Sequence, residues 1–329
     1  IHILSYKNIM SQPQTLASVP TNTVNNLHPE LQTELDKIRV KKAFNPNLWL
    51  IPRCQELLRY LKKYNIKTTV LAVSGGVDSA AVLALLKLSQ DLAKQDPTHP
   101  FNPTNGGKII GIAQPIYSTP EIQNRAFEVI EKLFSVTLDN NKCIDCEGLK
   151  FVTVDQSEDY DLKVRRFERT NGHVMKPFAA AMLKSYMRTT TNYEYALNFG
   201  GVVIGTGNLD EDGYLYYYCK FGDGAVDLGL IWDLHKSEVF TLARHIGVPE
   251  SILIAPPSAD LAPGQTDETE IGTTYNSVEL VYNYIVNYSQ EERESFIATL
   301  SEEAKNQFDR EKSIIIFIIY NDVFIVNVC

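Results

Sequence analysis

The sequence predicts an α/β fold, an open parallel sheet with helices on both faces, and three observations lead to this class. Short apolar segments rich in β-branched residues alternate with longer helical patterns along the 329-residue chain. Strand–helix–strand units pair their strands in parallel through right-handed crossovers. Glycine-bearing loops at 74–76 and 205–207 directly follow predicted strands, which is where ligands bind in such sheets. The composition, 44% hydrophobic and 22% charged, is typical of a globular protein.

The predicted elements follow one another in a regular order. The strands are short, apolar and β-rich, and we expect them at 67–73, 108–113, 151–154 and 201–205. The helices have wide apolar faces or helical spacing, and we expect them at 28–42, 46–64, 80–92, 119–134, 177–197, 236–246 and 276–288. Local signals support two of them. The segment 118–121 (STPE) is a capping pattern with proline in the first turn, and Gly247 ends the helix before it.

The two ends of the chain differ from its middle, which predicts three parts: a flexible segment at 1–27, one domain at 28–307 and an apolar tail at 308–329. Residues 11–26 are rich in Ser, Thr, Pro, Asn and Gln, which favours mobility. The apolar stretch Ile314–Val328 is interrupted by Asn321-Asp322 and is shorter than the roughly 18–20 apolar residues of a membrane span. Its β-branched residues predict a two-stranded hairpin that turns at Asn321-Asp322.

Charge and cysteine content limit the partners and the compartment. The formal net charge of −9 disfavours nucleic acid, because broad binding needs Lys and Arg to neutralise phosphates. Five cysteines in a long chain do not predict a disulfide framework, and no signal-peptide pattern is visible, so we expect a cytoplasmic protein. Cys143 and Cys146 form a lone CxxC without a second ligand pair at zinc spacing. A plain loop is favoured there, and a metal or redox role stays open.

The segment Ser74-Gly75-Gly76-Val77-Asp78-Ser79 lies between a predicted buried strand and an apolar helix. Two consecutive glycines let the backbone turn tightly and approach a ligand closely. The N–H groups of the loop and of the helix start then converge on one anion, assisted by the helix dipole. Asp78 would repel phosphates unless Mg²⁺ lies between them, and carboxylate oxygens suit that ion. The segment therefore predicts a phosphate site with Mg²⁺.

The alternative for this segment is a Gly-Gly turn before a helix whose first residues, Asp and Ser, are common caps. It is neither a Walker A loop, having no GK[ST], nor a GxGxxG dinucleotide loop. It resembles the pyrophosphate loop of the N-type ATP pyrophosphatases, whose fold is Rossmann-like (adenine nucleotide alpha hydrolase-like). The resemblance implies that AMP is transferred from ATP to an oxygen, that pyrophosphate leaves, and that a nucleophile displaces AMP.

Further motifs follow in the second half of the chain. They are 205–211 (GTGNLDE), 220–227 (KFGDGAVD), 233–239 (DLHKSEV), 257–261 (PSADL) and 265–272 (QTDETEIG). In order and spacing they resemble the NAD synthetases, and the resemblance covers about Leu48 to Tyr284. It implies an ammonia-dependent ligase that amidates deamido-NAD through an acyl-adenylate, with ATP as co-substrate, giving NAD, AMP and pyrophosphate.

The resemblance also implies a role for each matching position. The positions that match ATP contacts are Ser74, Gly75, Gly76, Asp78, Ser79, Arg188, Thr206, Lys236 and Ser258. Asp78 and Glu211 match the two carboxylates that hold Mg²⁺, and Lys236 matches the lysine that meets the phosphates. The positions near deamido-NAD are Lys220, Asp223 and Asp227. Catalytic roles fall to Asp78, Lys236 and Asp223, the last as a candidate base that takes a proton from ammonia.

Three of these side chains have plain structural alternatives. Glu211 can be a solvated loop acid, Lys236 a surface lysine at a helix start, and Asp223 a turn former between two glycines. Two positions depart from the family pattern, because Tyr186 and Gln114 stand where arginine is usual. Either a neighbour takes over or the adenylated partner binds differently, and the candidate neighbours are Arg165, Arg166 and Arg169. The insert at 138–176 is longer and more charged than expected for the short bacterial enzymes.

The resemblance further implies a homodimer with the dinucleotide site at its interface. Only 73 residues precede Ser74, too few for the amidase domain of glutamine-using relatives, so we expect free ammonia or ammonia from a partner protein. Two alternatives stay open. Another ATP-pyrophosphatase ligase or a tRNA-modifying enzyme would use the same adenylation chemistry and would explain Cys143 and Cys146. A nucleotide-binding relative without catalysis would suit the missing arginines.

Overall fold

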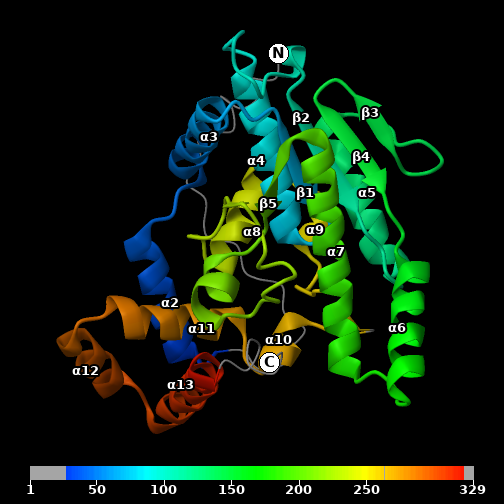
Figure 1. Ribbon diagram of the computed structural model, residues 1–329. Helices are drawn as coiled ribbons and strands as arrows, with labels where there is room; N and C mark the ends of the chain where they lie inside the picture. Colours follow the sequence, from blue (N-terminus) through cyan, green and yellow to red (C-terminus); the bar gives the residue numbers. More distant parts are fainter. Residues whose placement is uncertain (1–26, 263, 322–329) are drawn as a thin grey trace.

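A six-stranded sheet forms the centre of the computed structural model, which describes residues 27–262 and 264–321 (Figure 1). Its strand order is β3-β4-β2-β1-β5-β6. The strands are β1 (Thr68–Ala72), β2 (Lys108–Ala113), β3 (Ile144–Cys146), β4 (Leu149–Thr153), β5 (Gly201–Gly205) and β6 (Leu228–Gly229). Neighbouring strands pair in parallel, except that β3 runs antiparallel to β4 at one edge. The predicted open α/β sheet is confirmed, with one antiparallel edge strand added.

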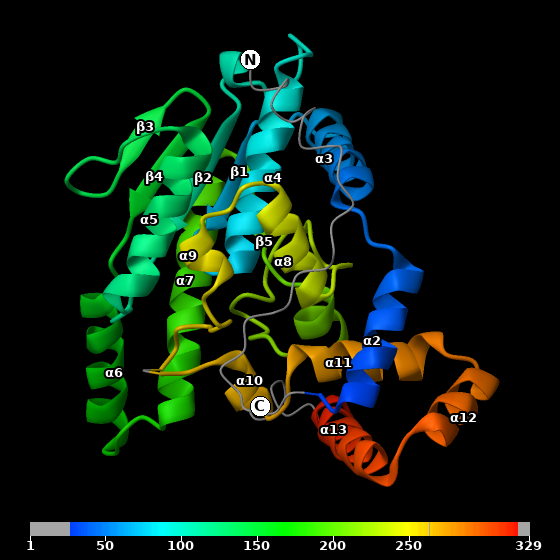
Figure 2. The same cartoon turned by 180° about the vertical axis from the view of Figure 1, so that it is seen from behind.

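Helices cover both faces of this sheet (Figures 1 and 2). The helices of the described residues are α2 (Pro29–Lys42), α3 (Pro46–Lys63), α4 (Val77–Ala93), α5 (Pro120–Phe134), α6 (Ser157–Asn171), α7 (Pro177–Phe199), α8 (Lys236–His245), α9 (Glu250–Leu253), α10 (Asp267–Ile271), α11 (Tyr275–Tyr282), α12 (Gln290–Thr299) and α13 (Glu302–Asn321), and only some of them lie on the sheet. A 3-10 turn at 103–105 and π-helical turns at 209–215 and 283–287 complete the set. No described helix combines the length and the apolar character that crossing a bilayer requires.

Alternating apolar residues explain why both faces of the sheet are covered. Val70 of β1 packs with Ile110 of β2 and Ala196 of α7, whereas its neighbour Leu71 belongs to the larger core that includes α4 and α8. Successive side chains of a strand point to opposite faces, so a strand buried on both sides needs an apolar residue at nearly every position. The run Val70-Leu71 in β1 meets this need.

The path of the chain makes the gap between β1 and β5 a topological switch point. From β1 the chain builds outward through β2 towards β4, and it then returns through α7 to β5 on the other side of β1. At such a point the connections leave in opposite directions, and a crevice opens outside the carboxyl ends of the strands. Residues 74–76 follow β1 and residues 206–208 follow β5. The topology therefore brings two predicted motifs to one crevice.

Four helices, α2, α11, α12 and α13, lie together at one end of the molecule (Figures 1 and 2). The predicted hairpin at Asn321-Asp322 is wrong, because residues 302–321 form a single helix that packs against α2 and α11. Its buried side chains recur every three or four residues, at Ala304, Phe308, Glu311, Ile315 and Ile318. The helix also crosses the domain boundary predicted at residue 307. Residues 1–26 and 322–329 lie outside the described part, so their predicted character stays a prediction.

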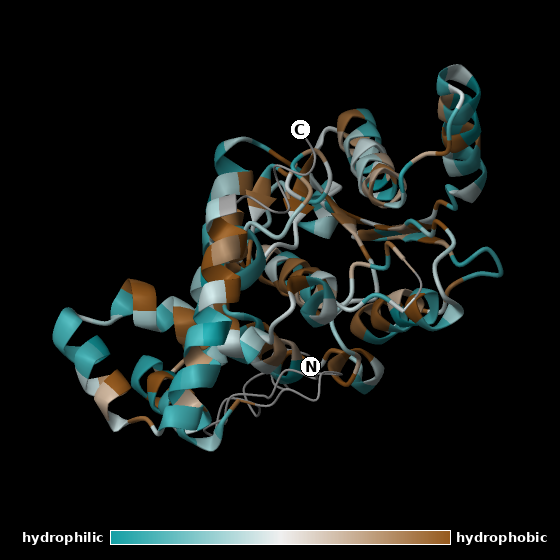
Figure 3. Cartoon of the chain, turned by 90° about the horizontal axis from the view of Figure 1, so that it is seen from below, coloured by the Kyte–Doolittle hydropathy of each residue, from teal (hydrophilic) through white to brown (hydrophobic). Residues whose placement is uncertain are grey.

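The insert at 138–176 builds the β3–β4 edge hairpin and the helix α6. No residue of α6 is buried, and Figure 3 shows this helix at the edge of the molecule. Cys146 ends β3, and the Cys143 Sγ accepts a hydrogen bond from the Thr153 amide at 3.5 Å. Within the described ranges, no group of three or more His, Cys, Asp or Glu residues is arranged to hold a metal. The CxxC lies at the β3–β4 edge hairpin, and its metal or redox role stays a prediction.

Candidate active site

A cavity of about 290 Å³, enough for a small molecule, opens where the carboxyl ends of β1 and β5 meet. Its walls come from the loops after β1, β2 and β5, from α5 and α7, and from residues 255–261. Most of the predicted site residues line it, namely Ser74, Gly75, Gly76, Asp78, Ser79, Arg188, Thr206, Glu211, Asp223, Lys236 and Ser258. The fold thus joins residues that are far apart in the sequence into one site.

Hydrogen bonds of its own serines fix the conformation of the loop between β1 and α4. The Ser74 Oγ accepts from the Gly76 amide at 3.2 Å and lies 3.0 Å from the Ser79 Oγ. Gly75 has φ +83°, and a Cβ at this position would lie 2.4 Å from the Ile122 carbonyl oxygen of α5. Only glycine fits such a position. Gly76, the residue before α4, offers no side-chain cap, which leaves the first-turn amides of α4 for another acceptor.

Lys236 joins the two carboxylates that were predicted to hold Mg²⁺. Its Nζ donates to Asp78 Oδ2 at 2.7 Å and to Glu211 Oε1 at 2.6 Å, although its side chain is only 2% exposed. Asn208 donates to the other oxygen of Asp78 at 3.0 Å, and the Tyr275 hydroxyl donates to Glu211 at 2.5 Å. The surface-lysine interpretation of Lys236 is therefore excluded. Buried ions of this kind persist only when they are paired and hydrogen-bonded.

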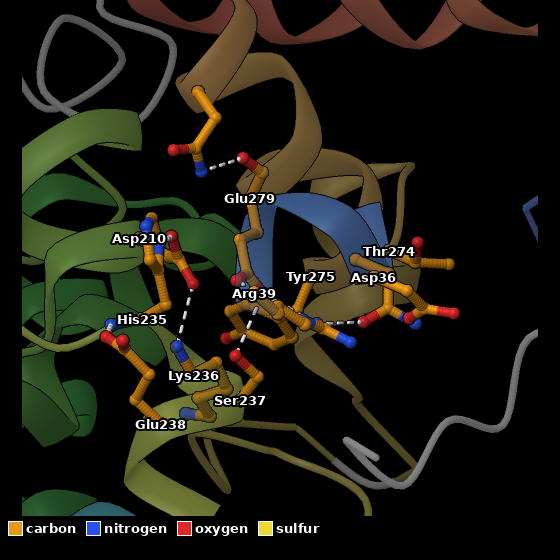
Figure 4. Close-up of polar contacts among 12 residues, drawn as sticks. Asp36, Arg39, Asp210, His235, Lys236, Ser237, Glu238, Thr274, Tyr275 and Glu279 are labelled. Atoms are coloured by element: carbon orange, nitrogen blue, oxygen red, sulfur yellow. Dashed lines mark hydrogen bonds and ion pairs between the residues drawn. The ribbon is translucent and has the colours of Figure 1, made fainter. Parts of the chain in front are cut away.

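A second row of buried groups fixes the start of α8, from which Lys236 projects (Figure 4). Asp210 is fully buried, and it accepts a hydrogen bond from the Lys236 amide at 2.8 Å and shares one of 2.7 Å with His235 Nδ1. Glu238 accepts from the His235 amide at 2.9 Å and pairs with Lys42 of α2 at 2.7 Å. These bonds position the backbone of Lys236 and hence its ammonium group.

The electrostatics of the cavity keep this ammonium charged. Burial lowers the pKa of Lys236, but the carboxylates of Asp78 and Glu211 outweigh burial and raise the pKa above its ordinary value. Burial, with the Glu211 carboxylate next, raises the pKa of Asp212 to about 8. Burial also raises the pKa of Asp267 to about 7, although Lys236 opposes this shift. The wall is therefore crowded with carboxyl groups, and an anionic ligand needs every available cation.

Sequence reasoning missed five charged residues of this wall, namely Arg125, Asp212, Asp260, Asp267 and Glu270. Asp212 follows Glu211, and Asp267 lies inside a quoted motif, but no spacing indicated that either faces the cavity. Arg125 stands in the middle of α5 and belongs to no motif, yet it lines the same cavity. A recognisable signal existed for Asp260, Asp267 and Glu270, since they lie in the motifs at 257–261 and 265–272.

Two predicted residues lie outside the cavity wall. Lys220 is exposed, with its Nζ 5.9 Å from the Phe221 ring centroid. Asp227 accepts from the Val203 amide of β5 at 2.8 Å and from the Tyr193 hydroxyl at 3.2 Å, so it braces the sheet edge. Asp223 does line the cavity, and it accepts from the Ser185 hydroxyl at 3.1 Å and from the Cys219 amide at 3.0 Å. Of the three residues assigned to deamido-NAD, the structure brings only Asp223 to the cavity.

Gln114 is one of the two positions that depart from the family pattern, and the structure shows its surroundings. Gln114 lines the cavity and is buried, and its amide group donates to Asn192 at 2.7 Å and accepts from Gln156 at 2.8 Å. Arg188 donates through Nε to the Gln114 carbonyl oxygen at 3.2 Å. The three arginines expected to substitute, Arg165, Arg166 and Arg169, all belong to α6, and no residue of α6 is among the residues described as lining the cavity. Compensation from α6 is therefore not seen.

Comparison with known proteins agrees with the motifs. Residues 50–313 match the family model described as NAD synthase. The NH(3)-dependent NAD(+) synthetase of Carboxydothermus hydrogenoformans is 34% identical over 231 residues, which is 69% of this chain and 83% of that protein. The NH(3)-dependent NAD(+) synthetase of Finegoldia magna is 30% identical over 74% of this chain and 88% of that protein.

A solved structure supports the same assignment at the level of the fold. The NMN synthetase of Francisella tularensis superposes with a TM-score of 0.59 at 24% identity, covering 82% of this chain and 96% of that one. The family match itself rests on the sequence, and it spans the β1–α4 loop, Lys236 and both bridged carboxylates. The chain therefore belongs to the NAD synthase family.

Proposed function

We propose that the protein amidates deamido-NAD with ammonia at the expense of ATP, giving NAD, AMP and pyrophosphate. The observation that carries this proposal is the single cavity in which the Ser74–Gly76 loop faces the Asp78–Lys236–Glu211 cluster. The amides in the first turn of α4, which no side chain caps, suit the phosphates of ATP. The neighbouring ammonium group suits a leaving group that gains negative charge. Asp223 lines the same cavity and offers a further carboxylate.

The residues present also fit a magnesium ion, which the family implies. Asp78 and Glu211 offer carboxylate oxygens beside the phosphate loop, and the described residues form no site with three or more protein ligands. Mg²⁺ is commonly held by one or two carboxylates together with substrate phosphates. Asp78 and Glu211 would hold the ion, which would supply positive charge next to the phosphates of ATP.

The proposed reaction has two steps. A carboxylate oxygen of the nicotinate group attacks the α-phosphorus of ATP, the bond to the β-phosphate oxygen breaks, and pyrophosphate leaves. Ammonia then attacks the acyl carbon, the bond to the AMP oxygen breaks, and one proton passes to a base. The loop amides and Lys236 stabilise the charge of the first step as preorganised donors. Asp223 is the base that we propose for the second step.

The test is release of pyrophosphate by the purified protein with Mg-ATP and ammonium. We expect release that requires deamido-NAD and that is accompanied by NAD. Nicotinate mononucleotide serves as the second acceptor, because the Francisella structure is that of an NMN synthetase. If pyrophosphate were released with the mononucleotide but not with deamido-NAD, the dinucleotide substrate would be wrong. The proposed adenylation and amidation chemistry would still hold. Tight ATP binding without turnover on either acceptor would favour a non-catalytic relative.

We also propose a cytoplasmic homodimer that uses free ammonia or ammonia from a partner protein. The four described cysteines form no disulfide, which suits a reducing compartment. Several large apolar side chains are exposed, among them Leu197 and Phe199 of α7 and Trp232 of the segment before α8. Exposed apolar groups of this kind favour association with a second copy. Light scattering should give twice 37.1 kDa, and a monomer at micromolar concentration would contradict the dimer.

A further inference from the structure

Arg125 has an unusual place in the wall of the cavity. It projects from α5, it is partly buried, and its Nε is buried without any hydrogen-bond acceptor within the described part of the chain. None of the described carboxylates makes an ion pair with it, and the Coulombic influence of Asp260 and Glu121 acts from a greater distance. Leaving a buried donor of a charged group unsatisfied is costly. The guanidinium group is therefore arranged for an acceptor that comes from outside the chain.

The position of α5 places this group next to the phosphate loop. The Arg125 Cβ lies 3.3 Å from the point that a Cβ on Gly75 would occupy, and the Ile122 carbonyl oxygen lies even closer. The helix is thus pressed directly against the turn of the loop. The side chain of Arg125 starts next to Gly75 and lines the same cavity as the loop, so its guanidinium group can share a ligand with the loop. Its planar fork of donors matches two oxygens of a phosphate group.

The charges of the wall leave Arg125 as its least engaged cation. Among the residues described as lining the cavity, the cations are Lys236, Arg188 and Arg125. Lys236 is bound by two carboxylates, and Arg188 lies 3.8 Å from the carboxylate of Asp260. The acids of the same wall are more numerous: Asp78, Glu211, Asp212, Asp223, Asp260, Asp267 and Glu270. A polyphosphate ligand gains most from the one cation that no carboxylate of this wall has already bound.

We infer that Arg125 binds the phosphate chain of ATP, together with the loop at 74–76. The inference rests on the proposed function only in its choice of ATP as the ligand. It assigns to α5, which carries no motif, a direct part in nucleotide binding. It also supplies a positive charge to a cavity in which Gln114 is neutral.

The experiment measures the binding of Mg-ATP and of inorganic pyrophosphate by calorimetry, without any acceptor. The variants are R125Q and R125K, and the matched control is K132Q, which removes one positive charge from an exposed position of the same helix. Hydrogen bonds between charged groups predict about 10- to 100-fold weaker binding of both ligands by R125Q. R125K should regain part of the affinity, and K132Q should bind like the unchanged protein.

Steady-state kinetics separate a contact with ATP from a structural role. We expect R125Q to raise KM for ATP by a similar factor and to leave KM for deamido-NAD within about twofold. Equal ATP binding by R125Q and K132Q would overturn the inference. So would a loss in D260N as large as in R125Q, because Arg125 would then act by holding the loop at 255–261. Binding of ATP without amidation would count against the proposed function and leave the assignment of Arg125 intact.

Discussion

Gly75 shows how a single residue shapes the phosphate loop. Its φ of +83° lies in the left-handed region, and the Ile122 carbonyl oxygen occupies the space of a Cβ. The first constraint alone costs about 1–2 kcal/mol for an alanine. The second requires backbone to move, because the obstacle is a carbonyl group of α5. The loop and α5 can therefore pack this closely only with glycine at this position.

We predict that Gly75→Ala lowers the free energy of unfolding by about 3 kcal/mol or more, and that it abolishes measurable ATP binding. Urea denaturation and calorimetry measure the two effects. The matched control is Gly172→Ala, because Gly172 also has a positive φ of +72° but nothing lies within 4 Å of its missing Cβ. The control should lose about 1–2 kcal/mol and keep ATP binding. Equal losses in both variants would contradict the role of the contact with α5.

Individual site residues could be predicted from motifs, but their mutual contacts could not. Asp78 and Lys236 were assigned separately from patterns, and their ion pair joins residues 158 positions apart. Spacing along the chain does not give distance across a fold. Arg125 was missed for the related reason that its partner would be a ligand, so no residue type elsewhere in the sequence announces it. Motifs indicate the residues that a family shares, whereas the contacts between them and the residues outside motifs become visible only in the structure.

Among the elements, α13 departs most from the sequence prediction. Its run of isoleucines looks like a strand, because β-branched residues favour extended structure. Tertiary packing overrides that preference, since Phe308, Ile315 and Ile318 fall on one helical face against α2 and α11. The spacing of these residues carried the helical signal. By contrast, β2 and β5 were predicted to the residue, because each is a short apolar run bounded by glycine or a loop.

We predict that Ile315→Ala destabilises the protein by about 2–4 kcal/mol, because Ile315 is fully buried in this interface. The control in the same helix is Tyr320→Ala, whose side chain is 82% exposed and which should change stability by about 0.5 kcal/mol or less. Denaturant unfolding of both variants makes the comparison. Similar, small effects at the two positions would mean that α13 does not pack as described.

At the scale of the whole molecule, α2 connects the last helices of the chain to the active site. Arg39 of α2 donates to Glu279 of α11 at 2.6 Å, and Glu279 also accepts from the Ser237 hydroxyl of α8 at 2.8 Å. Lys42 of the same helix pairs with Glu238, one turn or less from Lys236. Figure 4 shows Arg39, Ser237 and Glu279 gathered at this junction. The start of α8 is therefore supported by residues from both halves of the sequence.

This junction predicts a pH dependence of stability. Burial raises the pKa of Glu279, but the Arg39 guanidinium outweighs burial and holds the pKa below its usual value. A depressed pKa stabilises the folded state above the ordinary pKa of a glutamate, and this contribution is lost as the pH falls through the lower, folded-state value. We expect Glu279→Gln to cost about 3 kcal/mol at pH 7, since it leaves Arg39 unpaired.

The difference between the unchanged protein and this variant should narrow as the pH falls from the ordinary pKa of a glutamate, about 4.3, through the lower folded-state pKa of Glu279. Urea denaturation from pH 7 to pH 3 measures it. Glu291→Gln is the control, because Glu291 is an exposed acid on α12 and its replacement should leave the pH dependence unchanged. A difference in unfolding free energy that stayed constant from pH 7 to pH 3 would contradict the stabilising ion pair between Glu279 and Arg39.

The ion pair between α2 and α11 also sets an order of events during synthesis. Arg39 leaves the ribosome 240 residues before Glu279. At about 5–20 residues per second, this interval amounts to roughly 10–50 s. The β1–α4 loop and the strands around it are complete within that time, whereas α2 waits with its apolar side uncovered until α11 and α13 emerge. Helix α2, although synthesised early, is therefore among the last of the described elements to pack.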